Sequence, residues 1–235
     1  MRAIKDKAEI AEIRQAVALA EKAFQVIRAA LVPEQTERAI AFELENQIRR
    51  FGGAGCGFPP IVAMGARAAL PHAHPDNHTV SDSKMLLIDW GATAHLYRSD
   101  LTRVLVTGRI SPKFQRIYNV VLQAQQKAIA AIQPGAMVND IDAVARGIIT
   151  RAGYGKRFGH GLGHGFGLEI HEPPWLTSDV KRNRPLRAGM VVTVEPGIYL
   201  PGQGGVRIED DILVTRDGHE VLSHLPKELE DCVVR

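Results

Sequence analysis

The sequence is short of cysteine and of long apolar runs, and each shortage excludes a class of protein. Its 235 residues contain two cysteines, Cys56 and Cys232, and neither belongs to a CxxC pair. Two isolated cysteines cannot build a disulfide framework, which favours a reducing compartment. No apolar run approaches the roughly 20 residues that cross a bilayer, and the start MRAIKDKAEIAEIRQ lacks the features of a signal peptide. We therefore expect a cytoplasmic protein with no membrane partner.

Common catalytic and nucleotide-binding motifs are absent as well. The chain contains no GxGxxG, no phosphate-binding GxxxxGK(S/T), no HExxH and no GxSxG. The net charge is +3, and the lysines and arginines are scattered along the sequence. Without a basic stripe, nucleic acid is not an expected partner. We interpret Cys56, in its glycine-rich loop, as an incidental thiol and not as a nucleophile.

Apolar spacing predicts four amphipathic helices. Three cover about 5–31, 36–51 and 140–152, and another begins at Pro112 and stops before PGAM. Short apolar runs between turn formers predict strands, in the segments IVAMG, MLLIDWGA, LTRVLVTG, GMVVTVEPGIYL and GGVRIEDDILVT. The order helix, helix, strands thus occurs twice, with no linker between the halves. The sequence predicts one compact α+β domain over residues 1–235.

Two acidic residues fall inside strand-like sequence, where a lone charge is costly. Asp89 follows MLLI and Asp100 precedes LTRVLV, and burial of an unpaired carboxylate is strongly unfavourable. If these strands form an antiparallel pair that turns near Ala94 and His95, the two carboxylates lie opposite each other, with Cβ atoms about 5 Å apart. Like charges at that distance need a cation between them.

The second half repeats this arrangement with two glutamates. Glu195 in TVEPGIYL and Glu209 in VRIEDDIL flank the turn signal PGQGG. A hairpin centred near Gly202 therefore sets them opposite each other. A single acidic residue near a strand end is more often a surface charge than a ligand. Two such pairs beside a histidine cluster reverse those odds and favour a metal centre.

The glycine-rich segment GHGLGHGFGLEIHE supplies that histidine cluster. It contains His160, His164 and His171, and we interpret His164 as a nitrogen ligand, with the other two reaching into the same cavity. Four carboxylates and one imidazole suit two divalent ions about 3.5 to 4 Å apart, bridged by carboxylates and water. The segment PHAHP adds His72 and His74, of which we expect one to be functional and the other to be a solvated loop residue.

Five motifs, in this order, closely resemble the pita-bread metallopeptidases, the family of methionine aminopeptidase, aminopeptidase P and prolidase. The motifs are LIDWGA, YRSDLTR, GHGLGHGFGLEIHE, TVEPGIY and GGVRIEDD. The resemblance covers nearly the whole chain and implies the pita-bread fold, a pseudo-two-fold curved antiparallel sheet covered by helices. Proline-specific relatives usually carry an extra amino-terminal domain. We expect this chain to lack it, either as a natural short form or as an excised domain.

The five metal ligands of that family fall on five residues of this chain. By resemblance, Asp89 binds one ion, Asp100 and Glu209 bridge both, and His164 and Glu195 complete the other. The implied cofactor is a pair of divalent metal ions, with manganese favoured and cobalt, zinc or iron compatible with the ligand set. No ligand position is substituted, which weakens the alternative of a catalytically inactive, peptide-binding pita-bread module.

Within the family, the resemblance favours the proline-specific branch. Its members carry a histidine four residues before the metal histidine, here His160, which methionine aminopeptidases typically lack. The short connection from Glu195 to Glu209 is also similar to that of bacterial prolidases and Xaa-Pro aminopeptidases. We therefore expect hydrolysis of the bond between an N-terminal residue and proline in short peptides, with methionine aminopeptidase as the alternative. Dipeptidase and aminopeptidase activities both stay open, and a homodimer is compatible with the family.

The implied mechanism is attack by a metal-bridged hydroxide on the carbonyl that precedes proline. Glu195 would carry the proton from the water to the leaving nitrogen. His72 and His171 would stabilise the tetrahedral intermediate and the scissile carbonyl, and His160 would line the proline pocket. Arg207 lies two residues before a bridging glutamate, on the same strand face. It either orients a carboxylate or the substrate, or forms a structural salt bridge to a ligand.

Overall fold

A computed structural model describes residues 2–234, and its elements follow the same order in two halves. In the first half, the elements are α1 (Lys7–Ala29), α2 (Glu37–Arg50), β1 (Gly55–Cys56), β2 (Ile61–Met64), β3 (Met85–Trp90), β4 (Ala92–Ala94), β5 (Tyr97–Arg98) and β6 (Leu101–Val106). In the second half, they are α3 (Pro112–Ala130), α4 (Val138–Arg151), β7 (Gly163–Gly165), β8 (Glu172–Leu176), β9 (Val191–Val194), β10 (Gly197–Leu200), β11 (Gly204–Arg207), β12 (Asp210–Val214) and β13 (His219–Val221). The predicted repetition of helix, helix, strands is confirmed.

Capping residues set where the helices begin. The side chain of Asp6 accepts the N–H groups of Ala8 and Glu9, and the side chain of Glu9 accepts the N–H of Asp6. This capping box starts α1 at the residue after Asp6. The side chain of Ser111 accepts the N–H of Phe114 at the start of α3, and proline occupies the first turn of this helix. The first helix ends at Ala29, before Pro33, so the proline follows the helix but does not itself end it.

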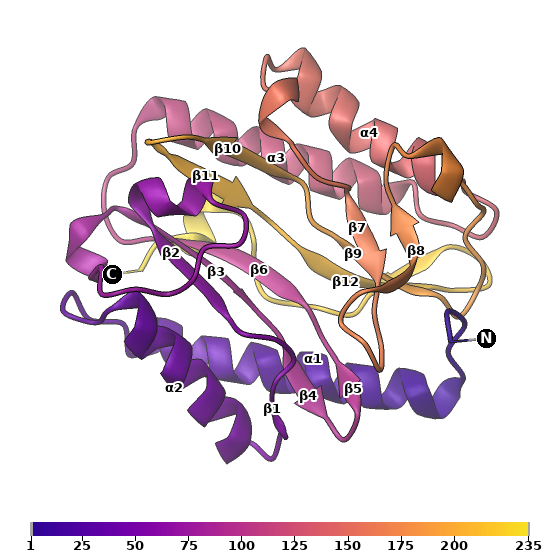
Figure 1. The fold of residues 1–235 in the computed structure, drawn as a ribbon, viewed down its shortest axis with the longest axis horizontal. Helices are drawn as coiled ribbons and strands as arrows, with labels where there is room; N and C mark the ends of the chain where they lie inside the picture. The colour runs from indigo at the N-terminus through magenta and orange to yellow at the C-terminus, as the bar shows by residue number, and fades with distance from the viewer. Residues whose placement is uncertain (1, 235) are drawn as a thin grey trace.

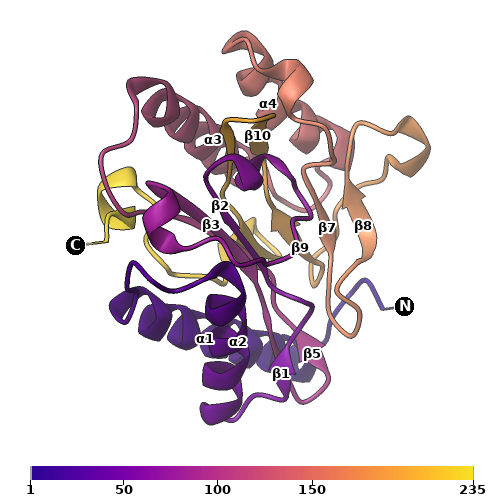
Figure 2. The same ribbon diagram turned by 60° about the vertical axis from the view of Figure 1, so that its left-hand side comes forward.

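The strands lie between two helix pairs. Figure 1 shows α1 and α2 along the lower side and α3 and α4 along the upper side, with the strands between them, and Figure 2 shows the same layers from another side. Strands β2, β3 and β6 form an antiparallel sheet in the first half, and β13, β12, β9, β7 and β8 form one in the second. An antiparallel bridge between Thr102 of β6 and Glu209 joins the two halves. The junction between the two halves therefore includes the predicted ligand Glu209.

Aromatic packing fixes the strand that carries Asp89. The ring of Trp90, at the end of β3, stacks on Phe24 of α1 with 4.4 Å between ring centroids, and its Nε1 donates to the carbonyl oxygen of Ala20 at 2.9 Å. Trp90 is fully buried. Truncation of such a side chain to alanine costs about 3–5 kcal/mol. Helix α1 thus holds β3 rigidly beneath the predicted site.

The register of the first carboxylate pair differs from the sequence prediction. Asp89 pairs with Thr102 across β3 and β6, and not with Asp100. The prediction of direct opposition is wrong because the tight turn of the continuing β4–β5 ribbon lies at 95–96, one residue later than expected. His95 occupies that turn with a left-handed φ of 49°. Since side chains alternate with a period of two, Asp89, Thr102 and Asp100 still point to one face of the sheet.

The register of the second carboxylate pair agrees with the prediction. Strands β10 and β11 pair from Gly197 and Arg207 to the turn around Gly202, which has a φ of 73°. The β9–β12 ladder continues in the same register on the other side. Both ladders place Glu195 opposite Glu209. The hairpin predicted from PGQGG is therefore confirmed.

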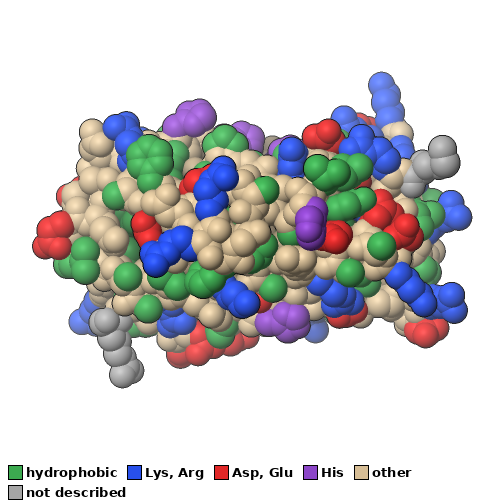
Figure 3. Space-filling view, turned by 90° about the horizontal axis from the view of Figure 1, so that it is seen from below, with side chains coloured by type: hydrophobic (Ala, Val, Ile, Leu, Met, Phe, Trp, Pro, Cys, Tyr) green, Lys and Arg blue, Asp and Glu red, His purple; other side chains and the backbone are tan. Residues whose placement is uncertain are grey.

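Acidic and basic side chains are mixed on one face of the molecule. On the face drawn in Figure 3, basic and acidic side chains are interspersed with apolar ones, and the residues drawn in colour form no stripe of one sign. Within residues 2–234, none of the helices combines the length and the apolar character needed to cross a bilayer.

Candidate metal centre

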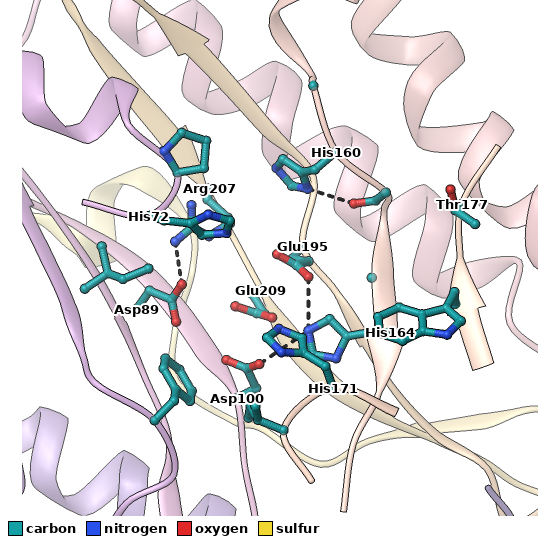
Figure 4. A pocket seen from close by; sticks show the side chains of 18 of the residues that line it. His72, Asp89, Asp100, His160, His164, His171, Thr177, Glu195, Arg207 and Glu209 are labelled. Atoms are coloured by element: carbon teal, nitrogen blue, oxygen red, sulfur yellow. Dashed lines mark hydrogen bonds and ion pairs between the residues drawn. The ribbon is translucent and has the colours of Figure 1, made fainter. Parts of the chain in front are cut away.

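All nine side chains predicted for the site line one cavity of about 540 Å³. They are His72, Asp89, Asp100, His160, His164, His171, Glu195, Arg207 and Glu209. Figure 4 shows them converging from both halves of the fold. Of the two PHAHP histidines, His72 lines the cavity, whereas His74 is exposed and does not belong to the lining.

Strand ends bring the candidate ligands together. Asp89 lies on β3, Asp100 precedes β6, His164 lies on β7, Glu195 follows β9, and Glu209 lies between β11 and β12. The first two ligands come from one half of the chain and the other three from the second half. The candidate centre therefore lies where the two sheets meet.

The glycine-rich segment forms strands that the sequence analysis did not predict. Gly163 and Gly165 flank His164 on β7, which pairs with both β8 and β9. A Cβ added at Gly163 would lie 2.1 Å from the carbonyl oxygen of Thr193, and one at Gly165 would lie 2.5 Å from that of Pro173. Only glycine permits so close an approach of neighbouring backbones. The glycines thus place His164 inside a sheet.

The centre of the cluster has the donor set of a cation site. Ligand atoms of Asp100, His164 and Glu209 all lie within 4.8 Å of one another. His164 Nε2 is 3.6 Å from Asp100 Oδ2 and 3.4 Å from Glu195 Oε1. Nδ1 of the same ring lies 3.1 Å from the carbonyl oxygen of Gly165 and donates to it. The lone pair of Nε2 therefore faces the carboxylates, as in a metal-binding histidine.

Burial perturbs the protonation of these groups. Desolvation raises the pKa of Asp100 and Glu209 well above their usual values, and repulsion from neighbouring carboxylates adds to the increase. Desolvation also raises the pKa of Glu195 to about 8, against the opposing charge of Arg207. Burial lowers the pKa of His164 to about 3, so its imidazole is neutral. Cations placed among these carboxylates would restore their ionised state.

Arg207 bridges the candidate ligands. Its Nη2 donates to Asp89 Oδ2 at 2.5 Å and its Nε to Thr102 Oγ1 at 3.1 Å. Thr102 Oγ1 in turn donates to Glu209 Oε2 at 2.6 Å. Of the two interpretations of Arg207, the geometry therefore favours a salt bridge to a ligand. The other oxygen of Asp89, Oδ1, is buried without a hydrogen-bond partner among the described residues, which leaves it free for a cation.

A directed hydrogen-bond chain connects Arg207 to His160. Arg207 Nη1 donates to Tyr199 Oη at 3.0 Å, so the hydroxyl proton of Tyr199 is free to point at His160 Nε2, 2.8 Å away. His160 Nδ1 lies 2.8 Å from the carbonyl oxygen of Gly161 and donates to it. Burial lowers the pKa of His160 to about 4, in agreement with this neutral tautomer. Tyr199 was not among the residues predicted from the sequence, although strand alternation places it on the same face as Glu195.

Two histidines form the exposed wall of the cavity. His72 and His171 are both exposed, and the ring of His171 lies 4.4 Å from that of His164, centroid to centroid. The ring of His171 is also nearly parallel to that of Trp175, with 6.5 Å between centroids. Desolvation, and then the proximity of His72, lowers the pKa of His171. Both imidazoles can therefore present N–H donors to a polar group inside the cavity.

Comparison with known proteins identifies the family. A model of metallopeptidase family M24 matches residues 11–216. An uncharacterized peptidase of Staphylococcus epidermidis is 44% identical over 227 residues, which cover 97% of this chain and 64% of that protein. The chain belongs to metallopeptidase family M24, whose members use divalent metal ions.

Solved structures give the same result for the fold. An Xaa-Pro dipeptidase from Bacillus anthracis superposes with a TM-score of 0.93 at 43% identity, covering 97% of this chain and 64% of that one. An X-Pro aminopeptidase from Thermotoga maritima superposes with a TM-score of 0.92 at 41% identity, with the same coverage of 97% and 64%. The expected α+β pita-bread fold is therefore confirmed. The chain spans slightly less than two thirds of the length of the relatives it matches.

Proposed function

We propose that this chain hydrolyses the bond between an N-terminal residue and a following proline in short peptides, with the help of two divalent metal ions. The observation that carries the proposal is the convergence of five ligand-type side chains and His160 on one cavity. The similarity to proteins named as an Xaa-Pro dipeptidase and an X-Pro aminopeptidase supports the proline-specific branch.

The proposed ligands are Asp89, Asp100, His164, Glu195 and Glu209. Two atoms fit bound cations: His164 Nε2, whose lone pair faces the carboxylates, and Asp89 Oδ1, which has no hydrogen-bond partner within residues 2–234. Four carboxylates and one imidazole are hard and borderline donors, which suit manganese and also cobalt, zinc or iron. When bound, such a pair of ions supplies Lewis-acid activation of a water and of a substrate carbonyl.

The side chains of the protein would move the proton and bind the substrate. Glu195 is the proposed proton carrier, which takes a proton from the attacking water and delivers it to the leaving nitrogen of proline. His72 and His171 would donate to the carbonyl oxygen as negative charge develops on it. His160, held by Tyr199, would contact the proline ring. The cavity volume of about 540 Å³ suits a peptide of a few residues.

Metal removal and a small peptide panel test the proposal. The purified chain is treated with a chelator, reloaded with manganese, and assayed on an Xaa-Pro dipeptide, an Xaa-Pro-Yaa tripeptide and a Met-Ala peptide. We expect manganese-dependent cleavage before proline and no release of methionine. Cleavage of the dipeptide alone would identify a dipeptidase, and cleavage of the tripeptide an aminopeptidase.

Two outcomes would contradict the proposal. Release of methionine from Met-Ala with the proline peptides untouched would identify a methionine aminopeptidase. Binding of Xaa-Pro peptides to the manganese-loaded protein without any turnover would identify a peptide-binding module. Metal content per chain, measured on the same samples, confirms that the reloading succeeded.

A further inference from the structure

Each half of the fold contains a buried carboxylate on its second helix that pairs with an arginine close to a cavity histidine. In the first half, the carboxylate is Glu37, the first residue of α2, and the arginine is Arg67 of a short 3-10 helix, Gly65–Ala69. In the second half, Asp142 and Arg146 both lie on α4. Glu37 and Asp142 are each 0% exposed. None of the four residues lines the cavity, so any role in the site is indirect.

The first pair holds the loop that carries His72. Glu37 Oε1 accepts the last N–H of β2 at 2.8 Å, and Oε2 accepts the N–H of Asp76 at 2.9 Å. Arg67 Nε lies 3.1 and 3.0 Å from the two carboxylate oxygens. Its Nη2 donates to the carbonyl oxygen of His74. These bonds fix the chain on both sides of His72, which lines the cavity together with Pro71.

The second pair holds the loop that carries His160. Asp142 Oδ1 accepts the N–H of Leu162 at 3.1 Å. Arg146 binds the carboxylate through two parallel bonds of 2.7 and 2.8 Å. Arg146 also donates to the carbonyl oxygens of Phe158 at 3.1 Å and His160 at 2.8 Å, and its guanidinium lies 4.3 Å from the Phe158 ring centroid. The loop is thus tied to α4 at His160 itself and two residues to either side, at Phe158 and Leu162.

These contacts add to the few other bonds that hold the backbone of the two loops. The N–H of Arg38 on α2 donates to the carbonyl oxygen of Asp76 at 3.1 Å, and the N–H of Glu195 donates to that of Leu162 at 2.8 Å. The arginines bind backbone carbonyls nearer the cavity, at His74 and at His160 itself. A catalytic side chain must be held within about 0.5 Å of its productive position, and a misplacement of about 1 Å can cost about 100-fold in rate. We propose that Glu37–Arg67 and Asp142–Arg146 are positioning pairs for His72 and His160. The kinetic part of this inference rests on the proposed function.

Substitution of the arginines gives the direct test. Arg67 and Arg146 are partly exposed, with 25% and 27% of their side chains accessible, so Arg67→Ala and Arg146→Ala leave each buried carboxylate bonded to its backbone N–H groups. We expect kcat/KM for an Xaa-Pro peptide to fall by about 10- to 100-fold in both variants. Amide hydrogen exchange should accelerate over residues 70–78 in the first variant and over 158–162 in the second. Metal content should stay unchanged in Arg67→Ala.

A matched control separates positioning from general loss of ion pairs. Arg14 forms a fork with Glu220, at 2.5 and 2.6 Å, but it joins surface elements outside the cavity. Arg14→Ala should leave kcat/KM and both loops unchanged. Lysine retains the charge but not the fork, so Arg67→Lys and Arg146→Lys should recover only part of the activity. If an alanine variant fails to fold, the lysine variant carries the test with the same measurements.

A double-mutant cycle decides whether each arginine acts through its histidine. In a His72→Ala background, Arg67→Ala should cost no further activity, and the same holds for Arg146→Ala in a His160→Ala background. Independent, multiplicative losses would overturn the inference, as would unchanged exchange in the two loops. If the parent protein cleaves no Xaa-Pro peptide, the proposed function fails, while the exchange measurements still decide whether the pairs hold the loops.

Discussion

The hydroxyl of Tyr199 lies 2.8 Å from Nε2 of His160, and the same hydroxyl accepts a bond from Arg207, which contacts the candidate ligand Asp89. Tyr199 is therefore the link between the candidate metal centre and the proposed proline pocket. The tautomer of His160 is fixed on the other side of the ring, because the carbonyl oxygen of Gly161 can only accept, and Nδ1 must therefore carry the proton.

Removal of this hydroxyl should impair substrate binding more than metal binding. Tyr199→Phe removes the bonds of the tyrosine hydroxyl to Arg207 Nη1 and His160 Nε2, and such a loss costs about 1–3 kcal/mol. We expect kcat/KM for Xaa-Pro peptides to fall by about tenfold, with metal content unchanged. Tyr97→Phe is the matched control, because the Tyr97 hydroxyl donates to Glu9 at 2.8 Å outside the cavity. Equal losses in both variants would contradict a specific role for Tyr199.

Glu195→Gln tests the proposed proton carrier. The amide keeps the size of the side chain but cannot accept and release a proton, so kcat should fall by about 10²- to 10⁴-fold at saturating manganese. Steady-state kinetics with metal content measured on the same sample check this. Full activity of the variant with both ions bound would show that another group moves the proton.

The metal-free protein should lose stability as the pH rises from about 5 to 8. Burial raises the pKa of Glu195 from 4.5 to about 8. A carboxyl with a raised pKa favours the folded state while it is protonated, and this contribution is lost as the pH passes through the folded-state value. Thermal unfolding between pH 5 and 8, with and without saturating manganese, measures the effect. Bound cations should remove the pH dependence and raise the melting temperature. A metal-free protein that becomes more stable over this range would contradict the assignment of these buried carboxyls.

Gly163 should not tolerate a side chain. A Cβ there would lie 2.1 Å from the carbonyl oxygen of Thr193, so Gly163→Ala must push β7 away from β9 and displace His164. We expect a loss of about 1–3 kcal/mol of unfolding free energy and reduced metal uptake. Gly159→Ala, in the same segment, is the control, because no heavy atom lies within 4 Å of its added Cβ. Equal metal uptake by both variants would contradict the strand placement.

A buried arginine beneath the site should be essential for stability. Arg103 donates to Asp210 Oδ1 at 2.7 Å and to the carbonyl oxygens of Thr102 at 3.0 Å and Leu225 at 2.9 Å. Removal of one partner of such a buried pair costs about 3–5 kcal/mol. Urea unfolding of Arg103→Met should show this loss, whereas the exposed pair of Arg14 should contribute less than about 1 kcal/mol. A difference of less than about 1 kcal/mol for Arg103→Met would contradict the expectation.

The sequence predicted the register of the second acidic hairpin correctly and that of the first incorrectly, and the difference has a physical reason. PGQGG supplies glycine where the second hairpin needs a positive φ, so the opposition of Glu195 and Glu209 followed from turn chemistry. The first hairpin turns at a histidine, His95, which gives no such signal, and its register was wrong by one residue at the turn.

Contacts that form only in the tertiary structure could not be predicted from the sequence. Strand β7 is rich in glycine and fully buried, because close backbone approach determines it. Strand β8 alternates in burial, but its sequence EPPWL contains two prolines and no apolar–polar alternation. Glu37 and Asp142 have the sequence pattern of ordinary exposed helix residues, and only the fold buries them. By contrast, the candidate ligands stood out because charge is rare inside strand sequence.

The bridge between Thr102 and Glu209 ties the two halves by a backbone bond of 3.2 Å and a side-chain bond of 2.6 Å. A substitution that shifts β6 therefore also moves an acidic group contributed by the opposite half. Mutational effects on either side of this junction should depend on one another, so the halves are constrained to evolve together even where their sequences share no visible similarity.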